Sequence, residues 1–430
     1  CDELTKSTQG NWPDVPFDAI CADGKACTGQ TGPSFFTRKR LTGITTQVWD
    51  AAAATPTYRT VDSWALTQQF LDPEDIGSTV DQVLWLSAIR HTNTVDGEIA
   101  TPPVRFAHTF LANRVDATDD ILPLTKPRIS MIVTETGAVV TVNYSDEQCV
   151  RGSTMPGSPD SNTMRCFPVY WNPNSVEDPV LDWFHKYVVT HVMVEDPTGG
   201  SPDLQTDYVY DRGGAWHHSD DPITKPKYRT WSQWRGYEHV TTLTGDPDDS
   251  MRSKTVSVYL RGMDGDKQAD GSKRPVKVTG IHAPALADED QYAGQERETV
   301  TYNGVSGAEV SGTITTPWSK PTASQAFTGY VAKAHLVRTA SLQERTVIAS
   351  GSSMRTRTRT TTTTYDDYGM STAEQDGGDD GVTGDETCER TWYARNPAKG
   401  ITSLVSRTQT VARSCADADK AVLPAKSNTP

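Results

Sequence analysis

Hydrophobic residues along most of this chain recur at every second position, which is the period of a β-strand. In residues 63–70, for example, Trp64, Leu66 and Gln68 would lie on one face of a strand and the residues between them on the other. Similar short runs occupy residues 44–49, 83–89, 104–108 and 129–133. Polar turns rich in glycine and aspartate separate the runs, as they do between antiparallel strands. The sequence therefore predicts an all-β fold, an extended antiparallel sheet made of hairpins.

Few segments have the period of a helix. The best helical candidate is residues 323–345, but Val331, Val337 and the threonines of this segment fit a strand equally well, so both structures remain open. Residues 216–228 contain two prolines, which exclude a long helix there. No long low-complexity linker divides the chain.

A loose repeat consists of a strand, a glycine turn, a second strand, and then a tyrosine followed by an aspartate. One copy joins residues 129–133 to 139–144 across Gly137, and another joins residues 186–194 to 204–210. Repeats of this kind favour a sheet that grows by accretion of similar units. The aromatic and acidic pairs that close the copies are Tyr144 with Asp146, Tyr210 with Asp211, and Tyr365 with Asp366.

The strand before the third pair is polar on both faces. In residues 354–365 arginines alternate with threonines, so that the arginines share one face and threonines the other. Such a strand fits a sheet that is wet on both sides, as in the wall of a hollow shell. We expect Asp366 to close the turn by accepting backbone N–H groups, Gly369 to reverse the chain, and Tyr365 to cover a neighbouring side chain. The arginines are Arg355, Arg357 and Arg359.

Residues 363–378 (TTYDDYGMSTAEQDGG) resemble the YD repeat of the Rhs family. Residues 206–216 (TDYVYDRGGAW) and the segment from Gly236 to Val240 are similar to blocks in the B component of insecticidal toxin complexes and in bacterial teneurin-like chains. Residues 180–190 and 261–266 resemble sequence segments of long actinobacterial Rhs-repeat proteins.

That resemblance implies a long sheet wound into a hollow shell, which in toxin members encloses a variable C-terminal toxin. The chain departs from the family in two ways. It has too few YD units to close a shell, and it lacks the Asp-Pro-x-Gly-Leu motif that seals one. Asp196-Pro-Thr-Gly199 shares some of these letters but lies in a predicted hairpin turn.

The resemblance thus implies a non-enzymatic scaffold segment of a secreted Rhs/YD-repeat toxin or teneurin-like protein. Its partner would be the enclosed C-terminal toxin polypeptide of the same full-length chain. The expected divisions are a cysteine-containing segment (1–40), a hairpin-rich shell segment (41–345) and a YD-like segment with a local disulfide (346–430). The alternatives are a secreted module or adhesin that binds a cell-surface glycan, and a secreted hydrolase that acts on glycans.

Seven cysteines are present without any C-x-x-C pair, a pattern that favours disulfides over a zinc or thioredoxin-like site. Their spacing predicts the bridges Cys149–Cys166 and Cys388–Cys415, with one more among Cys1, Cys21 and Cys27. Disulfides indicate an oxidising compartment, hence a secreted or cell-surface protein. Buried free thiols are the alternative. Cys1 also resembles the lipid-carrying first residue of a mature lipoprotein, although a trimmed boundary is the preferred interpretation.

Bulk properties and motifs exclude several classes of protein. The net charge of −14 argues against nucleic acid as a partner of the whole chain. No run of about 18 apolar residues is available for a membrane span. None of the familiar nucleophile-elbow, zinc-protease, P-loop or dinucleotide-binding motifs occurs in the sequence.

The remaining candidates for a site are acidic loops and tryptophans. Asp264, Asp266 and Asp270 have a spacing that could serve calcium, the only cofactor expected, although solvated turns are the simpler interpretation. A second acidic loop with Asp376, Asp379, Asp380 and Asp385 could bind calcium as well. His217-His218 followed by Asp220-Asp221 could form a metal or sugar site, although a cluster at a loop tip is the preferred interpretation. A glycan platform could be formed by Trp216, Trp231 and Trp234, although packing inside the sheet is the preferred interpretation. The arginine face of residues 355–359 could contact an acidic guest, or simply face solvent.

Overall fold

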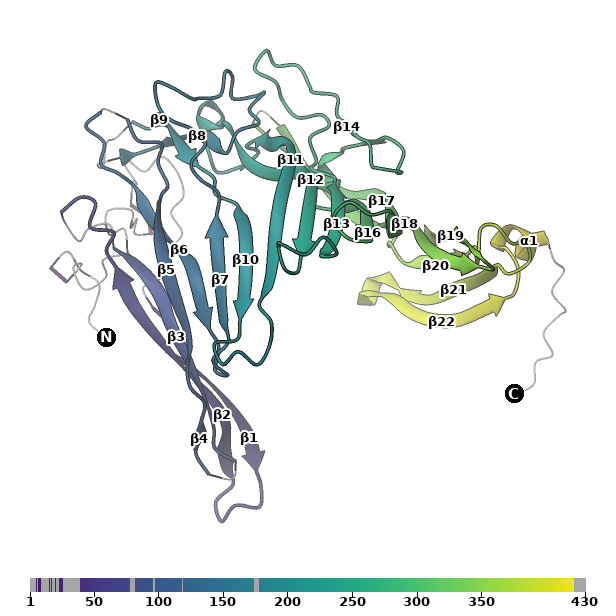
Figure 1. Cartoon of the computed structure of the whole chain (residues 1–430), viewed down its shortest axis with the longest axis horizontal. Coiled ribbons are helices and arrows are strands. Elements are labelled where there is room, and N and C mark those ends of the chain that lie inside the picture. Colours follow the sequence, from purple (N-terminus) through teal and green to yellow (C-terminus); the bar gives the residue numbers. More distant parts are fainter. Residues whose placement is uncertain are drawn as a thin grey trace. The chain divides into compact units, whose positions relative to one another are not determined.

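The computed structural model describes residues 39–77, 82–95, 97–117, 119–173, 178–328 and 330–420, together with residues 5, 7, 8, 15, 17, 20 and 23–25 (Figure 1). The described chain is almost entirely β-structure arranged in a large antiparallel sheet, which confirms the predicted fold class. Most of the predicted N-terminal segment 1–40, including Cys1, Cys21 and Cys27, lies outside the described residues.

The internal contacts of the chain define two compact units. The first unit comprises residues 1–208, 218–233 and 244–247, and the second comprises 209–217, 234–243 and 248–430. Strands β11 (Leu204–His218) and β12 (Trp231–Thr244) therefore contribute residues to both units. The expected boundary after Arg345 falls inside a strand, β18 (Tyr330–Ser350).

In the first unit, successive antiparallel pairings run β1–β2–β3–β5–β6–β7–β10–β11, with β4 on the side of β3. A separate ribbon pairs β8 with β9. The bounds are β1 (Gly43–Asp50), β2 (Thr57–Leu71), β3 (Val83–Asn93), β4 (Ile99–Ala100), β5 (Val104–Ala112), β6 (Thr125–Val133), β7 (Val139–Tyr144), β8 (Cys166–Trp171), β9 (Val180–His185) and β10 (Val189–Glu195).

In the second unit, the pairings run β13–β16–β17–β18–β19–β20–β21–β22, and all are antiparallel. A short ribbon, β14 with β15, lies in the long connection between β13 and β16. The bounds are β13 (Ser253–Tyr259), β14 (Lys277–Val278), β15 (Leu286–Ala287), β16 (Glu296–Tyr302), β17 (Glu309–Phe327), β19 (Ser353–Tyr365), β20 (Ser371–Asp376), β21 (Thr387–Asn396) and β22 (Ile401–Val411).

Helical structure is limited to short pieces. The described residues contain one α-helix, α1 (Cys415–Lys420), and the 3₁₀ turns η4 (Pro226–Tyr228), η5 (Asp290–Tyr292) and η6 (Pro397–Lys399). The segment 323–345, left open between helix and strand, is the hairpin of β17 and β18. The β-branched residues of this segment and the backbone hydrogen bonds between β17 and β18 favour the strand over the helix.

The apolar cores are small. In the second unit, Val258, Leu260, Val278 and Tyr292 pack together between β13 and the connection that follows it. In the first unit, a cluster forms around Val115 and the bridged cysteines 149 and 166. Among the described residues from β17 onward, Ile314 and Cys388 are the only buried apolar side chains. As expected for a sheet wet on both sides, β19 has no buried residue.

The predicted hairpins form, but one of them does not end where the repeat predicts. Strands β6 and β7 pair across Gly137, and β10 pairs with β11. Tyr210-Asp211 should close the second hairpin, yet β11 continues through this pair to His218. Arg212 and Gly213 have left-handed φ angles of 66° and 73°. The backbone is therefore irregular at these two residues, but the strand continues and no turn forms.

The corner after β19 forms as predicted. Asp366 Oδ1 accepts the backbone N–H groups of Tyr368 and Met370 at 2.8 and 3.1 Å, and Gly369 has a φ of 70°. The ring of Tyr365 packs on Trp318 with centroids 5.0 Å apart. Its hydroxyl donates to the carbonyl of Thr339 at 2.7 Å rather than pointing freely into solvent.

Candidate functional site

The structure separates the three predicted tryptophans into two packing arrangements. In the second unit, Trp216 is only 2% exposed, and its ring lies 4.8 Å from that of Trp234. Trp234 in turn contacts Tyr237 edge-on at 5.5 Å. In the first unit, Trp231 packs edge-on against His218 at 4.9 Å. Trp216 therefore has no exposed ring face to offer a sugar, and the cluster stabilises the strands that carry it.

Each aspartate of the predicted calcium loop has its own local contact. Asp264 Oδ1 accepts the N–H of Val276 at 2.8 Å, and Asp270 Oδ1 accepts that of Ser272 at 2.8 Å. The buried carboxylate of Asp266 lies 3.4 Å from Nε2 of His217. In the part of the chain that the structure describes, no three His, Cys, Asp or Glu side chains are grouped to hold a metal ion. Calcium binding by this loop stays a prediction.

Two buried carboxylates that sequence reasoning missed organise the same connection. Asp288 is fully buried and accepts the backbone N–H groups of Arg261, Gly262 and Met263 at 2.7 to 3.1 Å. Glu298, on β16, accepts the N–H groups of two residues of the connection at 3.0 Å each, those of His282 and Ala283. Hydrogen bonds of this kind replace the hydration that a buried carboxylate loses.

Glu298 also belongs to a closed ring of polar contacts. Nη2 of Arg345 lies 3.2 Å from Glu298, and Nε of the same guanidinium lies 3.1 Å from Glu309. Glu309 in turn contacts Nε2 of His282 at 2.6 Å. The ring ties the connection to β17 and β18. Nothing in the sequence marks these acids among the 55 that the chain contains.

The second acidic loop is the counterpart of the arginine face. Arg355 pairs with Asp379, and Arg359 with Asp376, each with a shortest N–O distance of 2.5 Å. Arg357 lies farther away, 3.8 Å from Asp379. The hydrogen bonds from Arg359 hold the pKa of Asp376 at about 2, well below its usual value. The arginines are thus neutralised within their own sheet.

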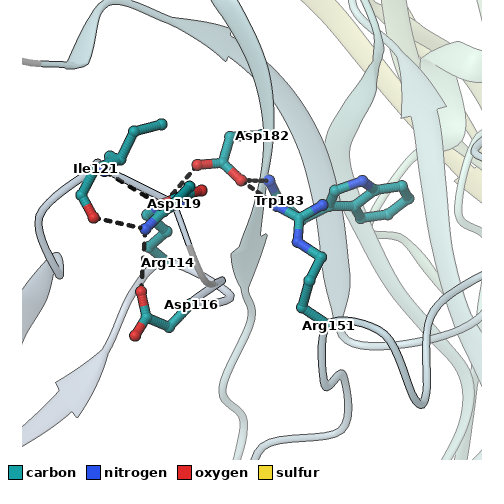
Figure 2. A network of polar contacts seen from close by, with 7 residues as sticks. All are labelled: Arg114, Asp116, Asp119, Ile121, Arg151, Asp182 and Trp183. Carbon is teal, nitrogen blue, oxygen red and sulfur yellow. Dashed lines mark hydrogen bonds and ion pairs between the residues drawn. The ribbon is translucent and has the colours of Figure 1, made fainter.

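An ionic network lies inside the first unit (Figure 2). The guanidinium of Arg114 is 1% exposed and contacts three carboxylates, those of Asp116, Asp119 and Asp182. It also donates to the carbonyl oxygen of Ile121 at 3.1 Å. Burial works to lower the pKa of Arg114, but the hydrogen bonds that its guanidinium donates to Asp182 and Asp119 outweigh this effect and raise the pKa. Arg151 contacts the other oxygen of Asp182.

Both predicted local disulfides form. The Cys149–Cys166 bridge closes a separation of 17 residues and is buried beside Val115. The Cys388–Cys415 bridge closes a separation of 27 residues and fastens α1 to β21. Of the two, the first also fixes the segment that carries Arg151, two residues beyond Cys149, and so connects covalent and ionic stabilisation of one region.

Comparison with known proteins assigns no family to this chain. No family model matches the sequence, and no curated protein shows significant similarity to it. None of the helices in the described ranges has the length and the hydrophobicity that crossing a bilayer requires. The function must therefore be inferred from the sheet, its internal charges and its disulfides.

Proposed function

We propose that this chain is a non-enzymatic structural segment of a secreted Rhs/YD-type protein, and that its sheet forms part of a wall that encloses or presents a C-terminal toxin polypeptide of the same full-length chain. The observation that supports the proposal most directly is the run from β17 to β22. It is a continuous antiparallel sheet in which almost none of the described apolar side chains is buried on either face.

A wall between two aqueous spaces has to be stable without a dry core. In this sheet, the ladder hydrogen bonds and cross-strand side-chain pairs take over that role. Sixteen residue pairs connect β17 to β18, and the next strand carries threonines and arginines opposite β18. The arginines find partners in the acidic loop 376–385, so that the wall does not carry a strong positive charge.

The corner after β19 is built to hold its shape. Besides the backbone N–H groups, Asp366 contacts the guanidinium of Arg395 on the neighbouring β21. That guanidinium also lies over the rings of Tyr368 and Tyr393, at 4.6 and 4.9 Å from their centroids. Cation–π contacts of this kind add to the strength of the ion pair. The Tyr-Asp pair is therefore linked to the adjacent strand, as a repeating wall requires.

Extracellular placement rests on the two disulfides, which persist in oxidising surroundings. A wall of this kind would be exposed to proteases and changing salt. Covalent closure of the segments 149–166 and 388–415 suits those conditions, because it limits how far the chain can open.

The test is to express the full product of the native gene and to treat it with a broad protease. Under the proposal, polypeptide C-terminal to these 430 residues stays protected until the shell is denatured, and the 430-residue chain alone turns over neither sugars nor peptides. Immediate digestion of the downstream polypeptide, or a native gene that encodes none, would overturn enclosure. A turnover abolished by a single carboxylate substitution would favour the hydrolase instead.

A further inference from the structure

The first unit contains a hollow of about 640 Å³, for which the proposed shell function gives no role. It opens on the sheet at β5, β6 and β7 and continues over the residues that follow β7 and precede β10. Its volume lies within the usual range of small-molecule sites, roughly 300–1,000 Å³. The lining residues that matter below are Leu111, Ser130, Tyr144, Asp146, Glu147 and Tyr187.

Two tyrosines of the hollow are fixed by hydrogen bonds to neighbouring backbone. The hydroxyl of Tyr144 donates to the carbonyl oxygen of Ile129 at 2.9 Å, and that of Tyr187 donates to the carbonyl oxygen of Ala112 at 2.8 Å. Burial raises the pKa of both tyrosines, so their hydroxyls stay protonated. Rings held in place before a ligand arrives lose little conformational entropy on binding.

Glu147 lies at the rim of the hollow, near Tyr187 and His185. Its Oε1 lies 3.2 Å from the hydroxyl of Tyr187, and its Oε2 lies 3.8 Å from Nε2 of His185. The imidazole of His185 is buried, and its Nδ1 has no hydrogen-bond partner among the described residues. The carboxylate itself remains about half exposed. Its oxygens can therefore still accept hydrogen bonds from a ligand.

The lining favours a ligand that donates hydrogen bonds and carries no negative charge. Asp146 and Glu147 are the charged residues of the lining, and none of the described residues in the lining is basic. The hydroxyl of Tyr144 uses its proton on a backbone carbonyl, and that of Tyr187 shares its proton between the Ala112 carbonyl and Glu147, so both hydroxyls can offer a ligand acceptor lone pairs only. A sugar matches this set, because its hydroxyls donate to carboxylates while its C–H faces can contact Leu111 and the tyrosine rings.

From this geometry, we propose that the hollow is a binding site for a neutral sugar unit of a glycan. Glu147 accepts hydrogen bonds from the sugar hydroxyls, Asp146 contributes a second acceptor, and Tyr144 with Tyr187 forms the rigid wall. None of the predicted tryptophans lines the site, and the site is independent of the proposed shell function: a wall segment can carry it or lack it. An organic ammonium ion would also satisfy two carboxylates, and the experiment separates the two ligands.

The experiment uses the 430-residue chain and four trisaccharides: maltotriose, cellotriose, chitotriose and galactotriose. Saturation-transfer NMR detects binding, and calorimetry measures affinity at sugar concentrations up to about 10 mM, where weak sites with Kd near 1 mM are still seen. We expect at least one sugar to bind. Glu147→Gln should weaken it about tenfold, because a hydrogen bond to a charged acceptor is lost. Asp146→Asn should weaken it less.

Glu135→Gln is the matched control, since Glu135 lies exposed in the turn between β6 and β7 and does not line the hollow. It should leave the affinity unchanged, and thermal melts should show that all three variants stay folded. Choline serves as the ammonium probe. Binding of choline without any sugar would overturn the sugar assignment, and absence of both would overturn the site. Equal loss in the Glu135 control would show that sugars bind elsewhere.

Discussion

Asp182 and Arg114 form an ion pair in which neither side chain reaches solvent: Nε lies 2.5 Å from Oδ2, and the side chains are 3% and 1% exposed. Charges withdrawn from water in this way are stable only as long as each has its partner. Asp182 Oδ1 also accepts a hydrogen bond from the guanidinium of Arg151 and one from the backbone N–H of Trp183, the latter at 2.8 Å. The pair therefore concentrates much of the electrostatic stability of the first unit at one carboxylate.

Asp182→Ala should accordingly be among the most destabilising single changes in the first unit. It leaves a buried guanidinium without its main counter-charge, which typically costs about 3–5 kcal/mol. Urea denaturation followed by tryptophan fluorescence measures the loss. Asp116→Asn is the control: Asp116 contacts the same guanidinium but is 66% exposed, so its removal should cost less than about 1 kcal/mol. Similar losses of unfolding free energy for the two variants would mean that burial does not determine how much each ion pair contributes to stability.

The pKa of Asp376 should depend on its contact with Arg359. In the folded chain, its pKa is about 2, against roughly 3.9 when unfolded. Since the folded pKa is the lower one, the contact stabilises the protein above pH 4, and this contribution is lost as the pH falls from about 4 towards 2. NMR titration of the carboxyl carbon measures the pKa. Arg359→Gln should raise it towards 3.9, whereas Arg357→Gln should raise it much less.

Cleavage of either disulfide should weaken a different unit. The double change Cys388→Ser with Cys415→Ser removes a closure of 27 residues and should cost about 3 kcal/mol of stability. The change should also release α1, which native-state hydrogen exchange would register as lost protection in residues 415–418. The Cys149–Cys166 bridge should be unaffected in a non-reducing peptide map. Unchanged exchange near α1 would show that the helix is held by its side-chain contacts alone.

Gly369→Ala tests the corner after β19. The φ of 70° is unfavourable for any residue with a Cβ, and a Cβ built on Gly369 would lie 3.0 Å from Cδ1 of Leu336. We expect a loss of about 1–2 kcal/mol in thermal or urea unfolding. Gly351→Ala has a similar φ of 61° without any atom within 4 Å, so it should lose less. Gly157→Ala has neither problem and should be nearly neutral.

Much of the fold was accessible from the sequence because strands and turns have local signatures. Alternation marked the strands, Gly137 and Gly369 marked reversals, and the short separations between cysteines indicated both local bridges. Asp366 was identifiable for the same reason, since an aspartate before glycine accepts N–H groups only two to four residues away.

The features that depend on distant residues were not accessible. Asp182, Asp288 and Glu298 are buried, yet their types and neighbours are those of surface acids, and burial follows only from where the strands meet. The hollow of the first unit was missed because Tyr144 and Tyr187 come together through the pairing of β7 with β10. Whether Trp216 would pack inside the sheet or face a ligand stayed open for a similar reason, because the sequence does not show which aromatic rings cover one another.

From β16 to β22, every strand is hydrogen-bonded to the strand that comes next in the chain. Closing such neighbouring pairs requires only short loops, which are entropically the easiest to form and the fastest to fold. Each new strand can pair with the edge strand of the sheet already formed, and no residues from distant parts of the sequence are needed. Because a polypeptide leaves the ribosome from its N-terminal end, the order in which these strands are synthesised equals the order in which each can pair with the one before it.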